Sequence, residues 1–199
     1  MTGGIAVAGL DISFAIDAVR ASRAGRTDMP PRNWRQASAQ FDPILVLAAQ
    51  RTIAITVGEM LRGFGPHGSI SWVTSNEDAL RMVAGIKPKL IFVEQTGLGI
   101  DGLKFVRDLR QGGLPGKAAP VILMSDERSV SALRAAQNAG AHEFLVRPFS
   151  ADHLLKRLDA VASEPRPWFE TASYAGPDRR RFNTATTPVG QNRRKVVTS

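Results

Sequence analysis

Three groups of polar residues stand directly after runs of apolar residues, and their side chains could pair with one another or bind an anion. Glu94 follows Leu-Ile-Phe-Val, Ser125-Asp126 follows Val-Ile-Leu-Met, and Arg147-Pro148 follows Glu-Phe-Leu-Val. A guanidinium presents a planar fork that suits a carboxylate, so a pair between Glu94 and Arg147 is the first chemistry that these residue types suggest. A fourth apolar run, Ile44-Leu-Val-Leu47, is followed only by Ala48-Ala49-Gln50.

Five apolar runs alternate with five helical patterns over residues 42–163. The expected strands cover 44–47, 69–74, 90–93, 121–124 and 143–146, and the helices that follow them cover 53–64, 76–85, 102–111, 129–139 and 151–162. Strict alternation with short connections requires crossover helices and hence a parallel sheet. Right-handed crossovers then predict an α/β fold, a flavodoxin-like, doubly wound, five-stranded parallel sheet with strand order 2-1-3-4-5. In this fold the carboxyl ends of the strands, where ligands bind, meet at one edge of the sheet.

Two longer fragments resemble the receiver domain of two-component response regulators. They are Leu90-Ile-Phe-Val-Glu-Gln-Thr-Gly-Leu-Gly-Ile-Asp-Gly-Leu103 and Ala139-Gly-Ala-His-Glu-Phe-Leu-Val-Arg-Pro-Phe149, and the resemblance extends over residues 43–162. It implies a CheY-like domain in which a carboxylate at the end of the third strand accepts a phosphoryl group. It also implies two acidic magnesium ligands after the first strand, and a hydroxyl and a lysine that bind phosphoryl oxygens.

This sequence departs from the family pattern at most of those positions. Ala48 and Ala49 stand where the acidic magnesium ligands are expected, Glu94 stands at the phosphoacceptor position, and Arg147 replaces the lysine, whereas Ser125 keeps the hydroxyl. Alanine offers no oxygen ligand to a hard cation. We therefore expect a pseudo-receiver that has lost magnesium-dependent phosphorylation, uses no cofactor and is not an enzyme.

The same substitutions leave two interpretations of the signalling state. A Glu94–Arg147 pair, with Ser125 donating a hydrogen bond, would hold the site in an arrangement similar to the phosphorylated one. Alternatively, the site is merely filled in a way that keeps the fold stable. The resemblance makes Phe144 the switch aromatic, although a phenylalanine there is also a plain packing residue. It further implies that residues 129–162 form the usual partner or homodimer face.

The function that these features predict is a non-catalytic signalling protein of a two-component phosphorelay that acts by protein–protein interaction. Its partner would be a histidine kinase, a phosphotransfer protein, or a motor or effector component. One alternative is an unconventional phosphoacceptor that uses Glu94 or Asp126.

Residues 164–199 form a basic segment with several aromatic residues, and their turn residues and charge predict a disordered, largely solvated tail. The segment Tyr174-Ala-Gly-Pro-Asp-Arg-Arg-Arg181 resembles the C-terminal extension of a subset of receiver-only regulators. Arginines beside aromatic rings can clamp phosphates and stack on bases, so a cyclic dinucleotide is a second alternative, with the candidate residues Trp168, Tyr174, Arg179, Arg180 and Arg181. The other interpretation is a solubilising or partner-docking tail, with Trp168-Phe169 folded back on the domain.

Composition limits the remaining possibilities. Of the net charge of +8, residues 1–41 carry +2 (five Arg, three Asp), residues 42–163 carry +2 (fourteen basic, twelve acidic) and residues 164–199 carry +4 (seven basic, three acidic). A nearly balanced domain without a recognition motif argues against DNA as a partner. The absence of cysteine excludes disulfides and thiolate metal sites.

Three further expectations concern the histidines, the N-terminal segment and the location of the protein. The three histidines lack metal-ligand spacing and are each interpreted as surface residues. Residues 1–41 are expected to be either a loosely ordered extension or a segment with a short docking helix over residues 11–23. No apolar run is long enough to span a bilayer and no secretory signal opens the chain, so a cytoplasmic location is expected.

Overall fold

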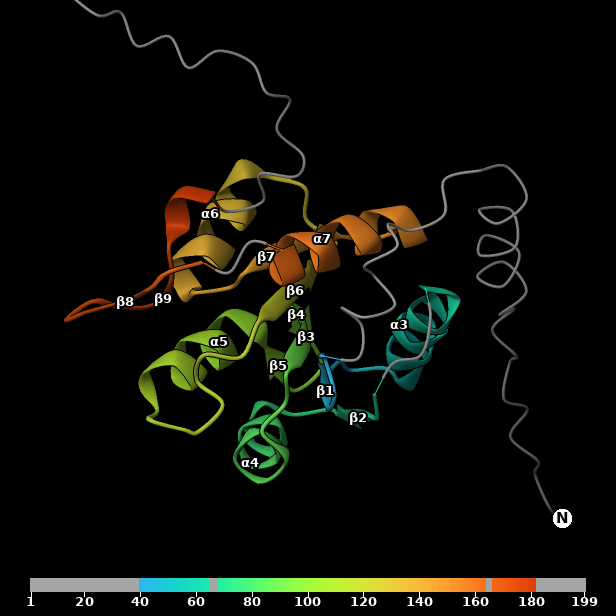
Figure 1. The fold of residues 1–199 in the computed structure, drawn as a ribbon, viewed down its shortest axis with the longest axis horizontal. Helices are drawn as coiled ribbons and strands as arrows, with labels where there is room; N and C mark the ends of the chain where they lie inside the picture. The colour runs from blue at the N-terminus through green and yellow to red at the C-terminus, as the bar shows by residue number, and fades with distance from the viewer. Residues whose placement is uncertain (1–39, 65–67, 164–165, 182–199) are drawn as a thin grey trace, which may run out of the picture.

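The computed structural model describes residues 40–64, 68–163 and 166–181; the helix expected over residues 11–23 lies outside them. The main sheet contains five parallel strands in the order β2-β1-β3-β6-β7 (Figure 1). These strands are β1 (Ile44–Leu47), β2 (Ile70–Val73), β3 (Leu90–Glu94), β6 (Val121–Ser125) and β7 (Glu143–Val146). Along the chain they are the five expected strands, so the predicted order 2-1-3-4-5 is confirmed.

The helices cover the two faces of this sheet, as a doubly wound fold requires (Figure 1). Two of them, α3 (Arg51–Phe64) and α7 (Ala151–Ser163), pack on one face. The other three, α4 (Asn76–Ile86), α5 (Gly102–Gln111) and α6 (Val130–Ala139), pack on the opposite face. Alternate residues of β1 divide between the two cores: Leu45 and Leu47 join the α4–α5–α6 side, and Ile44 and Val46 join the α3–α7 side. Each face of the sheet is therefore buried, which explains the continuous apolar runs in the sequence.

Side-chain caps fix where the helices begin. The hydroxyl of Ser75 accepts a hydrogen bond from the Asp78 N–H at 3.1 Å, and Ser129 does the same for the Ala132 N–H at 3.0 Å. At the other end of α6, Gly140 adopts a left-handed conformation with φ of 97°. These start and stop signals are readable in the sequence, and the helix bounds agree with the expected ranges to within two residues.

A small hairpin lies beyond the carboxyl end of β3. It consists of β4 (Thr96–Gly97) and β5 (Ile100–Asp101), which pair antiparallel. Leu98 at its tip is 92% exposed. The hairpin leads directly into α5 and lies over the edge of the sheet where the polar groups were expected to meet.

The prediction of a disordered, solvated tail from residue 164 onward is wrong for residues 166–181. Strands β8 (Trp168–Thr171) and β9 (Tyr174–Pro177) form an antiparallel hairpin, and a 3₁₀ turn, η1 (Arg179–Arg181), follows it. Figure 1 shows this hairpin beside α5 and α6. Residues 182–199 lie outside the described residues. In the described part of the chain no helix is long and apolar enough to cross a membrane.

Candidate functional site

Glu94 ends the central strand β3, and its carboxylate accepts hydrogen bonds from groups that follow β1 and β7. The side chain is 7% exposed. Its Oε1 accepts a hydrogen bond from Arg147 Nη1 at 2.7 Å, and its Oε2 accepts one from the main-chain N–H of Ala49 at 2.8 Å. The ion pair expected from the sequence is therefore present, and both carboxylate oxygens are engaged inside the protein.

Arg147 follows β7 and bridges two carboxylates. Its Nη2 lies 2.8 Å from Asp126 Oδ2, while its Nη1 binds Glu94. The arginine side chain is 19% exposed and that of Asp126 is 74% exposed, so the bridge joins a buried carboxylate to a surface one. The Arg147–Pro148 peptide bond is cis. The fork geometry of the guanidinium allows this double contact, which an ammonium group would not reproduce.

Ser125 does not make the contact that was expected of it. Its hydroxyl accepts a hydrogen bond from the Glu127 N–H at 3.0 Å, and none of its hydrogen bonds to described residues goes to Glu94. The hydroxyl instead closes the turn after β6, a local bond that serine makes readily with the main chain two residues on. The predicted donation from Ser125 to Glu94 is therefore wrong for this structure.

The two alanines at the expected magnesium positions contribute main-chain groups rather than side chains. Ala48 is fully buried, and its carbonyl accepts a hydrogen bond from Trp72 Nε1 at 2.9 Å. The N–H of Ala49 binds Glu94. Among the described residues, no group of three or more His, Cys, Asp or Glu could hold a metal ion. A magnesium ion needs several oxygen ligands, so the donor set at this edge does not fit one.

The β4–β5 hairpin closes the space above the pair. A methyl group added at Gly97 would lie 3.0 Å from Ala49 Cβ and 3.1 Å from Glu94 Oε2. The main chain at residue 97 thus passes against the carboxylate and the alanine. Little room remains beside Glu94 for a further group.

Phe144, the expected switch aromatic, lies in the interior. It is 4% exposed and belongs to the core that β7 shares with α5 and α6. In the sheet it pairs with Leu123, two residues before Ser125. This buried position fits both interpretations of the sequence, a switch aromatic and a plain packing residue.

The residues proposed for a nucleotide site are largely used within the chain. The Arg110 guanidinium lies 5.5 Å from the centre of the Trp168 ring, and the Arg179 guanidinium lies 4.5 Å from that of Tyr174. Arg179 Nη1 also donates to the side chain of Asn138 at 2.9 Å. Trp168 is thereby folded back on the domain, as one interpretation of the sequence held. Among the candidates whose side chains the structure describes, Arg180 is exposed and its side chain makes no hydrogen bond or ion pair with a described residue. Nucleotide binding stays a prediction.

Arg110 is a fully buried cation that sequence reasoning missed. Its described partners are uncharged: the indole of Trp168, the imidazole of His142, and the main-chain carbonyls of Gly140, Lys117 and Ala119. Burial lowers the pKa of Arg110 to about 9. Three carbonyls and an indole face replace the water that a guanidinium would otherwise bind. The C-terminal hairpin thus covers a charge at the amino-terminal edge of the sheet, opposite Glu94.

His142 is only partly exposed and its ring is hydrogen-bonded within the protein, so the expectation of a plain surface residue is wrong for this histidine, and His67 lies outside the described residues. Its Nδ1 accepts hydrogen bonds from the Val121 N–H and from Arg110 Nη2, both at 3.2 Å. Burial, followed by the nearby charges of Arg110 and Arg166, lowers the pKa of His142 well below its ordinary value. His153 is exposed, as expected.

A second buried charge cluster joins the hairpin to α7. Glu143 Oε1 lies 2.7 Å from Arg166 Nη2, and its Oε2 lies 3.3 Å from Arg157 Nη1. Desolvation raises the pKa of Glu143, although the two arginines oppose the shift. Because Arg166 belongs to the segment after α7, this cluster ties that segment to the first residue of β7.

Comparisons with known proteins agree with the fold. The family model described as the response regulator receiver domain matches residues 44–159. The response regulator MprA of Mycobacterium avium (strain 104) is 29% identical over 107 residues, which are 54% of this chain and 46% of that protein. MprA of Mycobacterium leprae is 30% identical over 99 residues, or 50% of this chain and 42% of that protein. The chain therefore spans about half the length of the curated relatives it matches.

Solved structures show the same fold. The chemotaxis response regulator CheY4 of Vibrio cholerae aligns with a TM-score of 0.52 at 22% identity, covering 59% of this chain and 96% of that one. A response regulator from Thermotoga maritima aligns with a TM-score of 0.52 at 23% identity, covering 61% of this chain and 97% of that one. At these identities the likeness supports the fold alone.

Proposed function

Because the chain belongs to the response regulator receiver domain family, a family of signalling domains rather than of enzymes, we propose that it is a pseudo-receiver of two-component signalling. In this proposal the domain accepts no phosphoryl group through magnesium. It works by protein–protein contact in one fixed state. Its partner is a histidine kinase, a phosphotransfer protein, or a motor or effector component.

The observation that carries the proposal is the closed arrangement around Glu94. A carboxylate that attacks a phosphoryl donor needs an accessible oxygen and a cation that neutralises the incoming charge. Here Arg147 and the Ala49 N–H occupy the two oxygens, and Gly97 lies against the same carboxylate. Ala48 and Ala49 supply no side-chain oxygen for magnesium.

The same contacts support a fixed, active-like state over a merely inert one. Arg147 places a positive charge beside the acceptor position, where the phosphorylated family site also has a charged pair. The inward position of Phe144 is compatible with that state. A permanent ion pair of this kind needs no signal to form, so the partner surface would be available at all times.

Two measurements on the full chain test the proposal. Incubation with radiolabelled acetyl phosphate, with and without magnesium, should leave the chain unlabelled. A label that disappears in Asp126→Asn or Glu94→Gln would instead identify an unconventional phosphoacceptor, and Asp126 is the more accessible of the two carboxylates. In partner capture, Glu94→Gln and Arg147→Ala should each weaken recovery while the circular dichroism spectrum stays unchanged.

The matched control is Arg107→Ala on α5, an exposed arginine outside both the ion-pair site and the expected partner face of residues 129–162. It removes the same charge without touching the pair. Undiminished capture by both Glu94→Gln and Arg147→Ala would contradict the fixed-state proposal, even if the chain remained unlabelled.

A further inference from the structure

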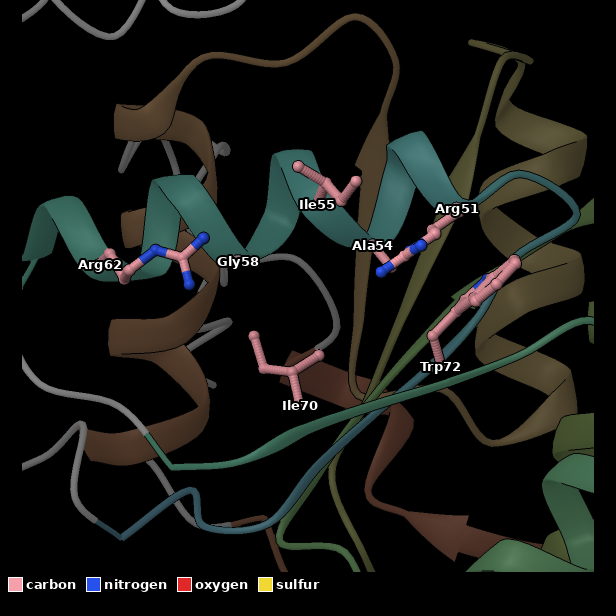
Figure 2. A pocket seen from close by; sticks show the side chains of 7 residues that line it. All are labelled: Arg51, Ala54, Ile55, Gly58, Arg62, Ile70 and Trp72. Carbon is pink, nitrogen blue, oxygen red and sulfur yellow. The ribbon is translucent and has the colours of Figure 1, made fainter.

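A groove of about 480 Å³ opens between α3 and the edge strand β2 (Figure 2). Its lining residues fall on one stripe of α3 and on one side of β2; they are Arg51, Ala54, Ile55, Gly58, Arg62, Ile70 and Trp72. Ile55 is 45% exposed although it is apolar. Figure 2 shows Arg51 and Arg62 at opposite ends of the α3 wall, with Ile70 and Trp72 across from them. The volume is within the range of ligand-binding clefts.

The wall opposite α3 has an open main-chain edge. β2 is the last strand of the sheet and pairs only with β1 among the described strands. The carbonyls of Ser69 and Val73 accept hydrogen bonds from the β1 side. Since neighbouring residues of a strand direct their main-chain groups to opposite sides, those of Ile70 and Trp72 point outward. The groove therefore combines apolar side chains with main-chain donors and acceptors that pair with no described residue, the combination to which an extended peptide adds as a strand.

The charge of the groove selects its occupant. The side chain of Arg51 makes no hydrogen bond or ion pair with any described residue. Arg62 pairs with Glu59 through side chains that are 55% and 53% exposed, and such an exposed pair exchanges its partner at little cost. The two arginines are separated by about 16 Å along the helix. An extended segment of five residues spans about the same length, so carboxylates near its two ends would meet both arginines.

We propose that this groove captures an extended acidic segment of a partner protein, which pairs with β2 as an additional strand. One apolar side chain of the segment fills the space between Ile55 and Ile70, and carboxylates on either side of it bind Arg51 and Arg62. Trp72, held by its bond to the Ala48 carbonyl, forms the fixed end of the groove. This surface is distinct from the Glu94 site and does not depend on the signalling state proposed for that site.

Charge argues against the chain itself as the occupant. Residues 1–41 carry a net charge of +2 and residues 164–199 carry +4, so both extensions match an arginine-lined groove poorly. A second copy paired antiparallel through β2 would bring two further arginines to the same edge. Like charges placed across an interface disfavour it.

The test uses the ¹⁵N-labelled full chain and a synthetic peptide, acetyl-Asp-Thr-Ile-Thr-Asp-amide, in which both aspartates and the isoleucine share one face of a strand. Its matched controls are the Asn-Thr-Ile-Thr-Asn peptide and a version N-methylated at isoleucine. We expect amide shifts at Ile70 and Trp72, and an affinity that falls about tenfold in R51E/R62E. The exposed Arg107 on α5 offers a matched change, R107E, which should leave the affinity unaltered.

Several outcomes would overturn the proposal. These are shifts that map to another element, an affinity that R51E/R62E leaves intact, equal binding of the asparagine peptide, or no shift at peptide concentrations of about 5 mM. Hydrogen exchange of the chain alone adds an independent check. Slow exchange at the Ile70 and Trp72 amides without peptide would mean that the edge is already covered by this chain or by a second copy.

Discussion

Replacing Arg147 with methionine should destabilise the domain by about 3 kcal/mol, because Glu94 would be left buried with one hydrogen-bond donor. The Glu94 side chain is 7% exposed, and its two donors in the native chain are Arg147 and the Ala49 N–H. Removing one partner of a buried ion pair costs about 3–5 kcal/mol. Since the arginine side chain is itself 19% exposed, we expect the lower end of that range.

The reverse change should cost less, and the double change should cost least. In Glu94→Gln, Arg147 keeps its contact with the exposed Asp126 and some contact with water, so a loss of about 1 kcal/mol is expected. In Glu94→Leu combined with Arg147→Met, apolar groups replace both charges, a substitution that is often close to neutral, within about 1 kcal/mol. The single arginine variant would then be less stable than the double variant.

Urea unfolding at pH 7, followed by circular dichroism, measures these differences. With an m-value of about 2 kcal/mol per molar, a loss of 3 kcal/mol lowers the midpoint by about 1.5 M. Arg134→Met provides the control, because this exposed arginine should change stability by less than about 0.5 kcal/mol. A cost below about 0.5 kcal/mol for Arg147→Met would refute the reasoning, since the carboxylate would then not depend on its cation.

The remaining predictions concern the C-terminal hairpin and its surroundings. The folded pKa of His142 is lowered, so the unfolded chain binds more protons below about pH 6.5. The contribution of His142 to the free energy of unfolding is complete above that pH and falls by up to about 1.4 kcal/mol per pH unit below it. In urea titrations at several pH values, His142→Gln should remove this pH dependence, whereas the control His153→Gln should keep it. Trp168→Ala should lower stability by about 2 kcal/mol in thermal unfolding because it uncovers a buried guanidinium, whereas Phe169→Ala, at a residue 49% exposed, should cost less than about 0.5 kcal/mol. Tyr174→Phe removes one hydrogen bond to a main-chain carbonyl and should cost about 1 kcal/mol; no loss in the same assay would mean that water replaces that bond.

The sheet and the central ion pair could be predicted because their signals are local in the sequence. Uninterrupted apolar runs such as Ile44–Leu47 identify strands buried on both faces, and serine caps and glycine stops bound the helices between them. Once the strand order is known, the end of β3 and the end of β7 must lie at the same edge. Because Glu94 and Arg147 carry opposite charges and follow strands that end at this edge, an ion pair between them could be predicted.

The other contacts of the site depend on geometry that residue types do not encode. Any residue at position 49 other than proline has a main-chain N–H, so nothing in the sequence marks Ala49 as the second donor to Glu94. The Ser125 hydroxyl could bind either the Glu94 carboxylate or the main chain of the following turn. In the structure it accepts a hydrogen bond from the turn, at the Glu127 N–H. The sequence does not show that Asp126 binds Arg147, because this bond depends on the reach of the guanidinium.

The C-terminal hairpin could not be predicted from its own residues, because its stability comes from packing against α5, α6 and Arg110. Its strands contain glycine, proline and several exposed residues, a composition typical of a loop. A two-stranded hairpin is marginal alone and needs a packed surface. The buried Arg110 provides that surface, and a lone arginine within a helical pattern looks like an ordinary solvent-exposed residue.

The engagement of Glu94 by a main-chain group has a consequence for the evolutionary history of the site. Glu94→Asp alone would draw the carboxylate away from Ala49 and Arg147 and leave a buried charge poorly paired. Ala49→Asp alone would set a second carboxylate beside the first, and Arg147→Lys alone would lose the double contact with Asp126. Each of these single changes toward the family's acceptor pattern is therefore expected to lower the stability of the domain. If the site descends from a phosphoryl acceptor, as the proposed function implies, its return to that chemistry would require several changes at once.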